Sequence, residues 1–335
     1  MKFRLIPLVA VVASLTAMSA HAEGPIDGKV YGKLRLSADY VRTETSGTTT
    51  NTNELKSHAS RIGFKGATKL EGYNNLSVIY QAEYGIDGQI NNGNNWSARN
   101  TFLGLKSDFG TLIGGRHDTP MKSSQGKVDQ FNDVDGDFAS IMNGENRLNQ
   151  LVMYTTPSLS GLKASVAYVM SKDNAANSNN KNTQKNGISA AVMMDAGMFY
   201  GAVAYDQNIA NANTLRVTGV VKPVSDLQLG AMWQRTKCND STLSSCAPTN
   251  GASASDSENG YLVSAGYSIG AATLKAEYGD SDIYKLGLAK YKKDASIGAD
   301  YKLAKNTKVE GWVTQLKKDN GDKTTYIALG MEHKF

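Results

Sequence analysis

The sequence predicts an all-β protein, a 16-stranded antiparallel transmembrane β-barrel, on three observations. Apolar residues recur at every second position in many segments, short and long connections alternate between these segments, and the chain ends on the alternating segment TTYIALGMEHKF. A period of two is the pattern of a strand with one apolar and one wet face. A β-sandwich would also supply two such faces, so the connections decide in favour of the barrel.

The first 22 residues have the features of a secretory signal. Lys2 and Arg4 precede an apolar run, and Ala20-His21-Ala22 fits a cleavage site. We therefore expect a signal peptide at residues 1–22 and one barrel domain at residues 23–335. Loss of the two basic residues lowers the formal charge from +5 to +3, which is too small to favour nucleic acid as a partner.

The alternation is clearest near the start of the mature chain. Residues 29–41 place Leu34 and Leu36 on one face and polar residues on the other, and residues 58–70 repeat the pattern. In a barrel the polar face lines the lumen. The basic residues that we expect on this lumen wall are Lys33, Arg35 and Lys65.

The same reasoning, applied along the chain, gives the expected strands. They cover residues 28–42, 57–70, 76–85, 97–106, 111–118, 147–156, 162–171, 185–194, 199–207, 214–222, 227–237, 259–268, 272–280, 294–303, 307–317 and 323–335.

Short and long connections alternate between these strands. The short ones are residues 71–75, 107–110, 157–161, 195–197, 222–226 and 304–306, and the long ones include residues 43–55, 85–96, 171–184 and 237–258. One rim of tight turns and one rim of loops is the topology of an outer-membrane barrel, with the turns towards the periplasm. An even number of strands also lets the last strand pair with the first. Sixteen strands enclose a lumen too wide for side chains to fill, which predicts a water channel.

The chain has two cysteines, Cys238 and Cys246, close together in the segment CNDSTLSSC. In an exported protein this spacing favours a disulfide that closes a short loop. Two free thiols are the alternative. A metal site is less favoured, because no other Cys or His is near in the sequence.

The residues of the mature chain do not favour an enzyme. There are three histidines, His58, His117 and His333, with no metal-ligand spacing, and the G-x-S-x-G motif of hydrolases is absent. We expect no catalytic residue, no cofactor and no resident metal.

Five short stretches carry a resemblance to a known family. They are residues 60–66 (SRIGFKG), 98–105 (ARNTFLGL), 115–120 (GRHDTP), Arg147 with 154–157 (YTTP), and the terminal 333–335 (HKF). In this order they resemble the general trimeric porins of Gram-negative outer membranes, over the whole mature chain. The resemblance assigns Phe335 and His333 to the terminal assembly signal, where many porins have Tyr in place of His333.

The resemblance also implies partners and a function. It implies a homotrimer, in contact with outer-membrane lipid and lipopolysaccharide, that is assembled by periplasmic chaperones and the barrel-assembly machinery. The channel would pass ions and small hydrophilic solutes by passive diffusion. The alternatives are a substrate-specific channel, and a surface adhesin or phage receptor that uses the long polar loops.

The resemblance further implies that the third extracellular loop, residues 119–146, folds into the barrel and narrows it. Its acidic residues would form one half of the constriction: Asp129, Asp133, Asp135, Asp137 and Glu145. The basic half would be Arg61, Arg99, Arg116 and Arg147. Alternation alone directs Arg61 to the lumen, whereas Arg99 shares its parity with Leu103 and Leu105, and for Arg116 and Arg147 only the resemblance gives a direction.

Three other interpretations of these charged residues stay open. The loop could be a solvated acidic segment, and the arginines could merely form ion pairs on the wall. A calcium loop that begins at Asp133 is disfavoured, because Phe138 and Gly144 stand where an EF-hand needs Gly and Glu.

We predict that Cys238 and Cys246 are oxidised to each other in the mature protein. Mass spectrometry of unreduced protein should then show the linked loop peptide, and replacing both residues by Ser should leave channel conductance unchanged. Free thiols on protein isolated from membranes would contradict the pairing.

Overall fold

The computed structural model describes residues 27–86, 95–170, 186–239 and 256–335. The expected signal peptide, most of three of the long loops and Cys246 lie outside the described residues. Cys238 is the last residue of a strand and is buried, and its pairing with Cys246 stays a prediction.

Strands make up nearly all of the described chain. They are β1 Asp27–Thr45, β2 Thr48–Ser57, β3 Arg61–Lys69, β4 Ser77–Ile86, β5 Trp96–Ser107, β6 Gly110–Asp118, β7 Arg147–Thr155, β8 Leu162–Val169, β9 Gly187–Asp195, β10 Phe199–Ile209, β11 Ala212–Val224, β12 Leu227–Cys238, β13 Ser257–Ile269, β14 Ala272–Ser281, β15 Lys293–Ala304, β16 Thr307–Lys317 and β17 Lys323–Lys334. Three short helical turns complete the described elements: α2 Pro120–Ser123, η2 Phe138–Ser140 and η5 Ile283–Leu286.

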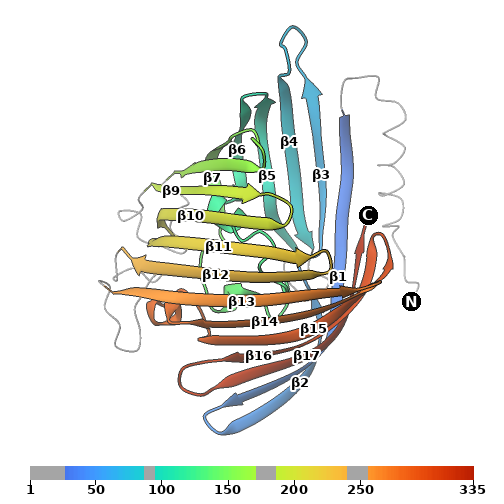
Figure 1. Cartoon of the computed structure of the whole chain (residues 1–335), viewed down its shortest axis with the longest axis vertical. Coiled ribbons are helices and arrows are strands. Elements are labelled where there is room, and N and C mark those ends of the chain that lie inside the picture. The colour runs from blue at the N-terminus through green and yellow to red at the C-terminus, as the bar shows by residue number, and fades with distance from the viewer. Residues whose placement is uncertain (1–26, 87–94, 171–185, 240–255) are drawn as a thin grey trace, which may run out of the picture.

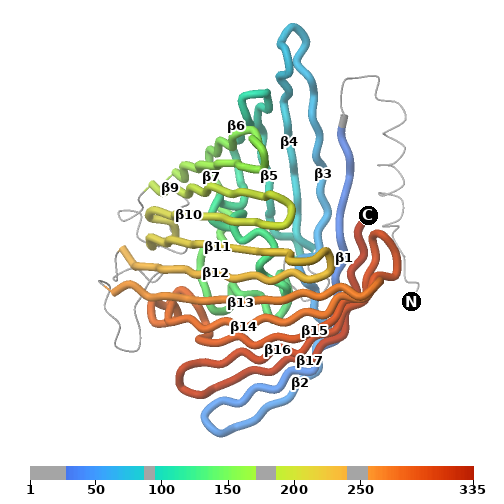
Figure 2. Tube along the Cα trace, in the orientation of Figure 1, coloured from blue at the N-terminus to red at the C-terminus, as the bar shows by residue number. Residues whose placement is uncertain are grey.

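These strands form one closed antiparallel sheet. Apart from β2 and β3, which both pair with β1, each strand pairs with the next, and β17 pairs with β1 from Lys33↔Lys334 to Glu44↔Lys323. β2 and β3 count as one barrel strand, because they pair with successive parts of β1 and are separated only by residues 58–60. The prediction of a 16-stranded antiparallel barrel is therefore confirmed. Figure 1 shows the strands side by side, and in Figure 2 the C-terminus lies beside β1.

The expected long loop at residues 43–55 is wrong. β1 and β2 continue through this segment and are joined by a tight turn at Ser46 and Gly47, whose φ angles are 49° and 81°. Positive φ at both central residues is what a two-residue hairpin turn requires. The threonines of this segment are polar, which suggested a loop, but they are also β-branched and therefore favour the strands of a long hairpin.

The two faces of the sheet have the opposite polarity to those of a soluble protein. On β1 the apolar Leu34 and Leu36 are exposed, whereas Lys33 and Arg35, which alternate with them, are 6% and 5% exposed. The wall therefore presents its apolar residues outwards and its charged residues to the interior. Lys65 of β3 also belongs to the inner face, where its Nζ lies 4.7 Å from the centre of the Tyr31 ring.

No helix in the described part of the chain is long and apolar enough to cross a membrane.

The last residue completes the closure of the sheet. The Phe335 amide donates to the Gly32 carbonyl at 3.1 Å, and the Gly32 amide donates to the Phe335 carbonyl at 2.9 Å. The Phe335 ring lies directly over Gly32, where a Cβ would come within 2.4 Å of the ring and 2.7 Å of the Arg61 carbonyl oxygen. Next to it, the ring of His333 is hydrogen-bonded through Nδ1 to the Thr307 hydroxyl at 2.8 Å.

We predict that Gly32→Val impairs closure of the barrel, because the new side chain meets both the Phe335 ring and an immovable backbone oxygen. Such overpacking costs about 1–3 kcal/mol. The measurement is the fraction of refolded protein that keeps the mobility of a closed barrel in unheated detergent gels. Gly219→Val is the matched control, since nothing lies within 4 Å of a Cβ at that strand position. Equal folding of the two variants would contradict the prediction.

Candidate pore constriction

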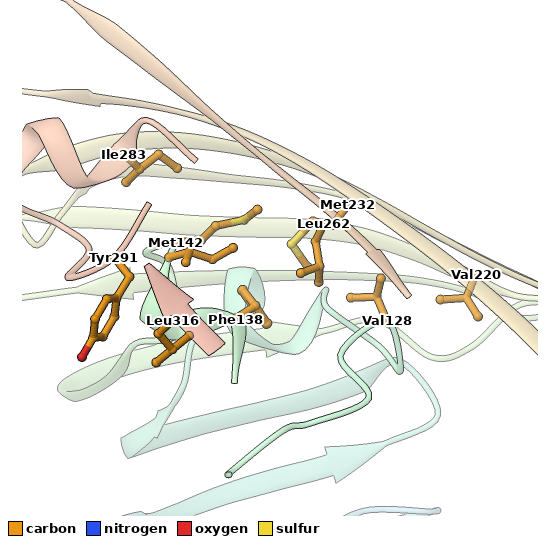
Figure 3. Packing of buried hydrophobic residues seen from close by; sticks show 10 residues of the cluster. Val128, Phe138, Met142, Val220, Met232, Leu262, Ile283, Tyr291 and Leu316 are labelled. Carbon is orange, nitrogen blue, oxygen red and sulfur yellow. The ribbon is translucent and has the colours of Figure 1, made fainter. Parts of the chain in front are cut away.

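The segment between β6 and β7, residues 119–146, lies against the inner face of the barrel wall. Its residues Val128, Phe138, Ile141 and Met142 are at most 1% exposed and pack against inward-facing side chains of β11, β12, β13 and β16 (Figure 3). The wall residues of this cluster include Val220, Met232, Leu262 and Leu316. Between Val128 and Phe138, the loop residues Phe131 and Val134 pack on Trp312 and Ala328. The loop is thus docked inside the barrel by apolar contacts.

A buried arginine adds a polar anchor to this docking. Arg216 of β11 is 0% exposed, and it donates to the Glu145 carboxylate at 2.8 Å and to the Asn143 carbonyl at 2.7 Å. The same guanidinium donates to Gln234 at 2.9 Å and lies over the ring of Phe138. Five fixed donors suit guanidinium to such a site, where several acceptors must be satisfied at once.

The arginines Arg61 and Arg99 meet at a shared carboxylate, Glu83 of β4. Arg99 Nε donates to Glu83 Oε1 at 2.7 Å, and Arg61 Nε lies 3.7 Å from Glu83 Oε2. The Tyr31 hydroxyl donates to the same Oε2 at 2.9 Å. Because Glu83 is only 6% exposed, both guanidinium groups are held in place on the wall.

A β-bulge explains why Arg99 faces inwards. Ala82 pairs with Thr101, but Tyr84 pairs with Ala98, so two residues of β5 lie opposite the single residue Glu83. An extra residue in one strand reverses the faces beyond it. Arg99 therefore shares the face of Glu83, although simple alternation would place it with the outward Leu103.

The loop brings one acidic side chain to these cations. Asp133 Oδ2 lies 3.2 Å from Lys33 Nζ and 3.9 Å from Arg61 Nη1. Burial alone would raise the pKa of Asp133, but the Lys33 ammonium and the Arg61 guanidinium outweigh it and hold the pKa below its usual value. Asp133 is therefore ionised at neutral pH and opposes the basic wall.

The backbone at Asp133 is unusual and well braced. Its φ is 65°, a left-handed conformation that Asp tolerates better than most residues. The Asp133 amide donates to Asp137 Oδ2 at 2.9 Å, and the preceding Asn132 carbonyl accepts from Arg35 Nη1 at 2.8 Å. Arg35 is itself paired with Glu310 of β16, with Nη2 2.8 Å from Oε2.

The other four acidic residues of the loop have different partners. Asp135 accepts from Lys56 Nζ at 2.8 Å and from Trp312 Nε1 at 3.2 Å. Asp137 accepts from the amide of Ala139 at 2.9 Å, and Asp129 from that of Phe131 at 2.7 Å. Glu145 contacts Arg216, as described above. These four carboxylates hold the loop in its fold and on the wall, and Asp133 is the one that meets Arg61.

The two remaining arginines lie apart from Asp133. Arg147 Nε is 2.9 Å from Asp118 Oδ1, at the base of the loop. Arg116 pairs with Thr101, and Gly114 pairs with Leu103, which is exposed on the outside of the barrel. Paired residues share a face and residues two apart in a strand do so as well, so Arg116 belongs to the outer face. Its described hydrogen bonds go to the Ala98 carbonyl and the Asn149 side chain.

Two hollows meet at Asp133. One, of about 550 Å³, is lined by Lys56, Arg99 and Asp135 among others. The other, of about 430 Å³, is lined by Lys33 and Arg61 and reaches the barrel end where β17 stops. Asp133 lines both, so it lies between the two hollows.

Sequence reasoning missed the residues that brace this place. Glu83 had a usable signal, because it stands on the polar face of an alternating strand. Arg216 is a polar residue in an alternating segment as well, whereas Lys56 follows the polar residues 48–54, and the partners of both in the loop follow no sequence period.

One group of side chains has the composition of a metal site. Ligand atoms of Asp39, His58 and Asp135 lie within 4.8 Å of one another. Lys56 Nζ is 3.2 Å from Asp39 Oδ2 and 2.8 Å from Asp135 Oδ1, so an ammonium already bridges these two carboxylates. The geometry does not fit an additional cation.

Comparisons with known proteins agree with the barrel fold. A family model described as "Gram-negative porin" matches residues 8–321. The major outer membrane protein P.IB of Neisseria sicca is 26% identical over 377 residues, with both chains covered completely, and P.IB of Neisseria lactamica is 26% identical over 361 residues with the same coverage.

Solved structures show the same fold at lower identity. The anion-selective porin from Comamonas acidovorans superposes with a TM-score of 0.71 at 19% identity, covering 92% of this chain and 100% of that one. OmpF of Salmonella typhi, in complex with daunomycin, gives 0.69 at 19% identity, covering 93% and 98%. Because the family model spans nearly the whole sequence, the chain belongs to the Gram-negative porins and forms an outer-membrane channel for passive diffusion.

Proposed function

We propose that Asp133, facing Lys33, Arg61 and Arg99, is the constriction that sorts ions and small hydrophilic solutes in this channel. The observation that carries the proposal is the position of Asp133, which lies 3.2 Å from Lys33 and lines both hollows of the interior. Fixed opposite charges beside a narrow wet passage create a local field, which orders water and disfavours apolar solutes that must displace it.

The bracing of these charges supports the proposal. Guanidinium stays charged at any working pH, and Arg61 and Arg99 share the buried Glu83. Asp133 is fixed from the other side by its loop, which is docked on the wall. A field from fixed charges keeps its direction while solutes pass, whereas mobile side chains would follow each ion.

We further propose that the protein is a homotrimer, placed in lipid and lipopolysaccharide by periplasmic chaperones and the barrel-assembly machinery, with its short turns towards the periplasm. This part rests on the resemblance to trimeric porins. We propose no catalytic role, since the family consists of channels. A substrate-specific channel would be recognised by a sugar or peptide that blocks the current with saturation.

We predict opposite shifts in ion selectivity when the two sides of the constriction are altered. Asp133→Asn should move the reversal potential in a salt gradient towards anion preference, and Arg61→Ala or Arg99→Ala towards cation preference. The shifts should shrink in concentrated salt, because the Debye length falls from roughly 10 Å at 0.1 M to about 3 Å at 1 M. Asp135→Asn should shift it less, since Asp135 is engaged by Lys56 and Trp312.

The control for this measurement is Arg235→Ala, because Arg235 is exposed on the outer face of β12. Reversal potentials at low salt that do not differ between Asp133→Asn, Arg61→Ala, Arg99→Ala and the control would show that these residues do not form the constriction.

We also predict that Arg216→Met loosens the loop without opening the barrel. The substitution leaves the Glu145 carboxylate and the Asn143 carbonyl without their buried partner, which typically costs about 3–5 kcal/mol. Single-channel recording should show larger current fluctuations than in the wild type, while the mobility in unheated gels stays that of a closed barrel. The current fluctuations should be smaller in Arg216→Met combined with Glu145→Gln than in Arg216→Met alone, since no unpaired charge is then buried. Current noise equal to the wild type in Arg216→Met would argue against the anchor.

A further inference from the structure

The hollow at the end of the barrel where β17 stops is strongly basic. Eight basic and four acidic side chains line its volume of about 430 Å³. Six of the basic residues are lysines, and we call the space that they surround the lysine hollow: Lys33, Lys275, Lys302, Lys305, Lys308 and Lys334.

The register of the sheet places four of these lysines in directly opposed pairs. Lys302 of β15 pairs with Lys308 of β16, and Lys33 of β1 pairs with Lys334 of β17. Directly opposed residues of an antiparallel pair point to the same face, with Cβ atoms about 4.5–5.5 Å apart. Like charges in this position destabilise a sheet, so both pairs oppose the stability of the wall that contains them.

The acidic side chains of the hollow do not cancel this charge. Asp300 is shared between Lys275 and Lys308, each at 2.8 Å. Glu332 is shared between Lys334 at 3.0 Å and Lys33 at 3.5 Å. Within the described residues, neither Lys302 nor Lys305 has an acidic partner within 4.0 Å, and both are exposed. The excess positive charge therefore faces the wet interior.

We propose that the lysine hollow is a binding site for multiply charged oxyanions of the phosphate type. An ammonium group binds phosphate as a point charge with rotatable donors. Two directly opposed ammonium groups can share one tetrahedral dianion, which relieves their mutual repulsion. A monovalent anion such as chloride has half the charge to offer and is held less well.

The place of the hollow gives this binding a consequence for the channel. Lys33 and Arg61 line the hollow and also face Asp133. A dianion in the hollow competes with Asp133 for Lys33 and lies next to the narrow part of the pore, so it alters the current of other ions. This inference rests on the proposed function, since it takes the passage beside Asp133 as the conducting path.

The test is a titration of potassium phosphate at neutral pH against single channels that conduct potassium chloride. We expect a saturable decrease of the current in the wild type. In the double variant Lys302→Gln/Lys305→Gln the half-blocking concentration should rise by about tenfold, the loss expected when two weakly screened charges near the ligand are removed. Glucose 6-phosphate should act like phosphate and glucose should not, since the phosphate group is what the lysines recognise.

Lys65→Gln is the matched control. It removes one positive charge, half of what the double variant removes, from the inner face of β3 outside the lysine hollow, so the two effects are compared per charge removed. An equal weakening in Lys65→Gln would overturn the site in favour of a diffuse field of the whole lumen, and a phosphate effect that never saturates would also overturn it.

A direct measurement separates this inference from the proposed function. Isothermal titration calorimetry of the detergent-solubilised barrel with inorganic phosphate should show binding in the wild type and Lys65→Gln, and weaker binding in Lys302→Gln/Lys305→Gln. Normal chloride conductance without phosphate binding would overturn the lysine hollow alone. Phosphate binding by the wild type, together with a reversal potential that Asp133→Asn does not change, would support the lysine hollow and contradict the proposed constriction.

Discussion

The pairing of β1 with β17 is the constraint on which the rest of this molecule depends. In the hydrocarbon of a membrane no water can satisfy a free amide or carbonyl, so a sheet that spans it must have no edge. Twelve residues of β1, from Lys33 to Glu44, find their partners in β17, and Phe335 adds two further backbone hydrogen bonds with Gly32. Once the ring is closed, the alternation of side chains puts every second residue in lipid and the others around water. The charged interior follows from that geometry.

The interior charges are arranged in shared rather than isolated pairs. Arg35 and Lys308 both contact Glu310, and Lys308 reaches Asp300, which also holds Lys275. Sharing lowers the cost of holding charge on a crowded wall, because each carboxylate is satisfied by two cations. It also leaves a local surplus wherever lysines outnumber carboxylates, as at Lys302 and Lys305. The same network thus stabilises one part of the wall and leaves another part with excess positive charge.

The loop between β6 and β7 forms a second layer inside the ring. Apolar packing inside a water channel is unusual, and here it has a clear effect, since Phe138, Ile141 and Met142 fix a long irregular segment against the wall. Arg216 satisfies the carbonyls that this docking removes from water. The left-handed residue Asp133 then stands at a defined distance from Lys33 and Arg61. The proposed sorting of solutes by these charges needs such rigidity on both sides.

The sequence by itself determined the barrel, the faces of its strands and the directions of Lys33, Arg35 and Arg61, because a period of two is a local property that each strand carries alone. The prediction from sequence failed at residues 43–55. The polar composition of this segment indicated a loop, whereas its threonines belong to two strands. Only the tertiary structure decided that a bulge turns Arg99 inwards, that the register turns Arg116 outwards, and that Asp133 is the loop carboxylate that meets Arg61. These features depend on how two strands are aligned and on how an irregular loop packs. Neither leaves a period in the chain, since the partners are up to a hundred residues apart and meet only when the ring has closed.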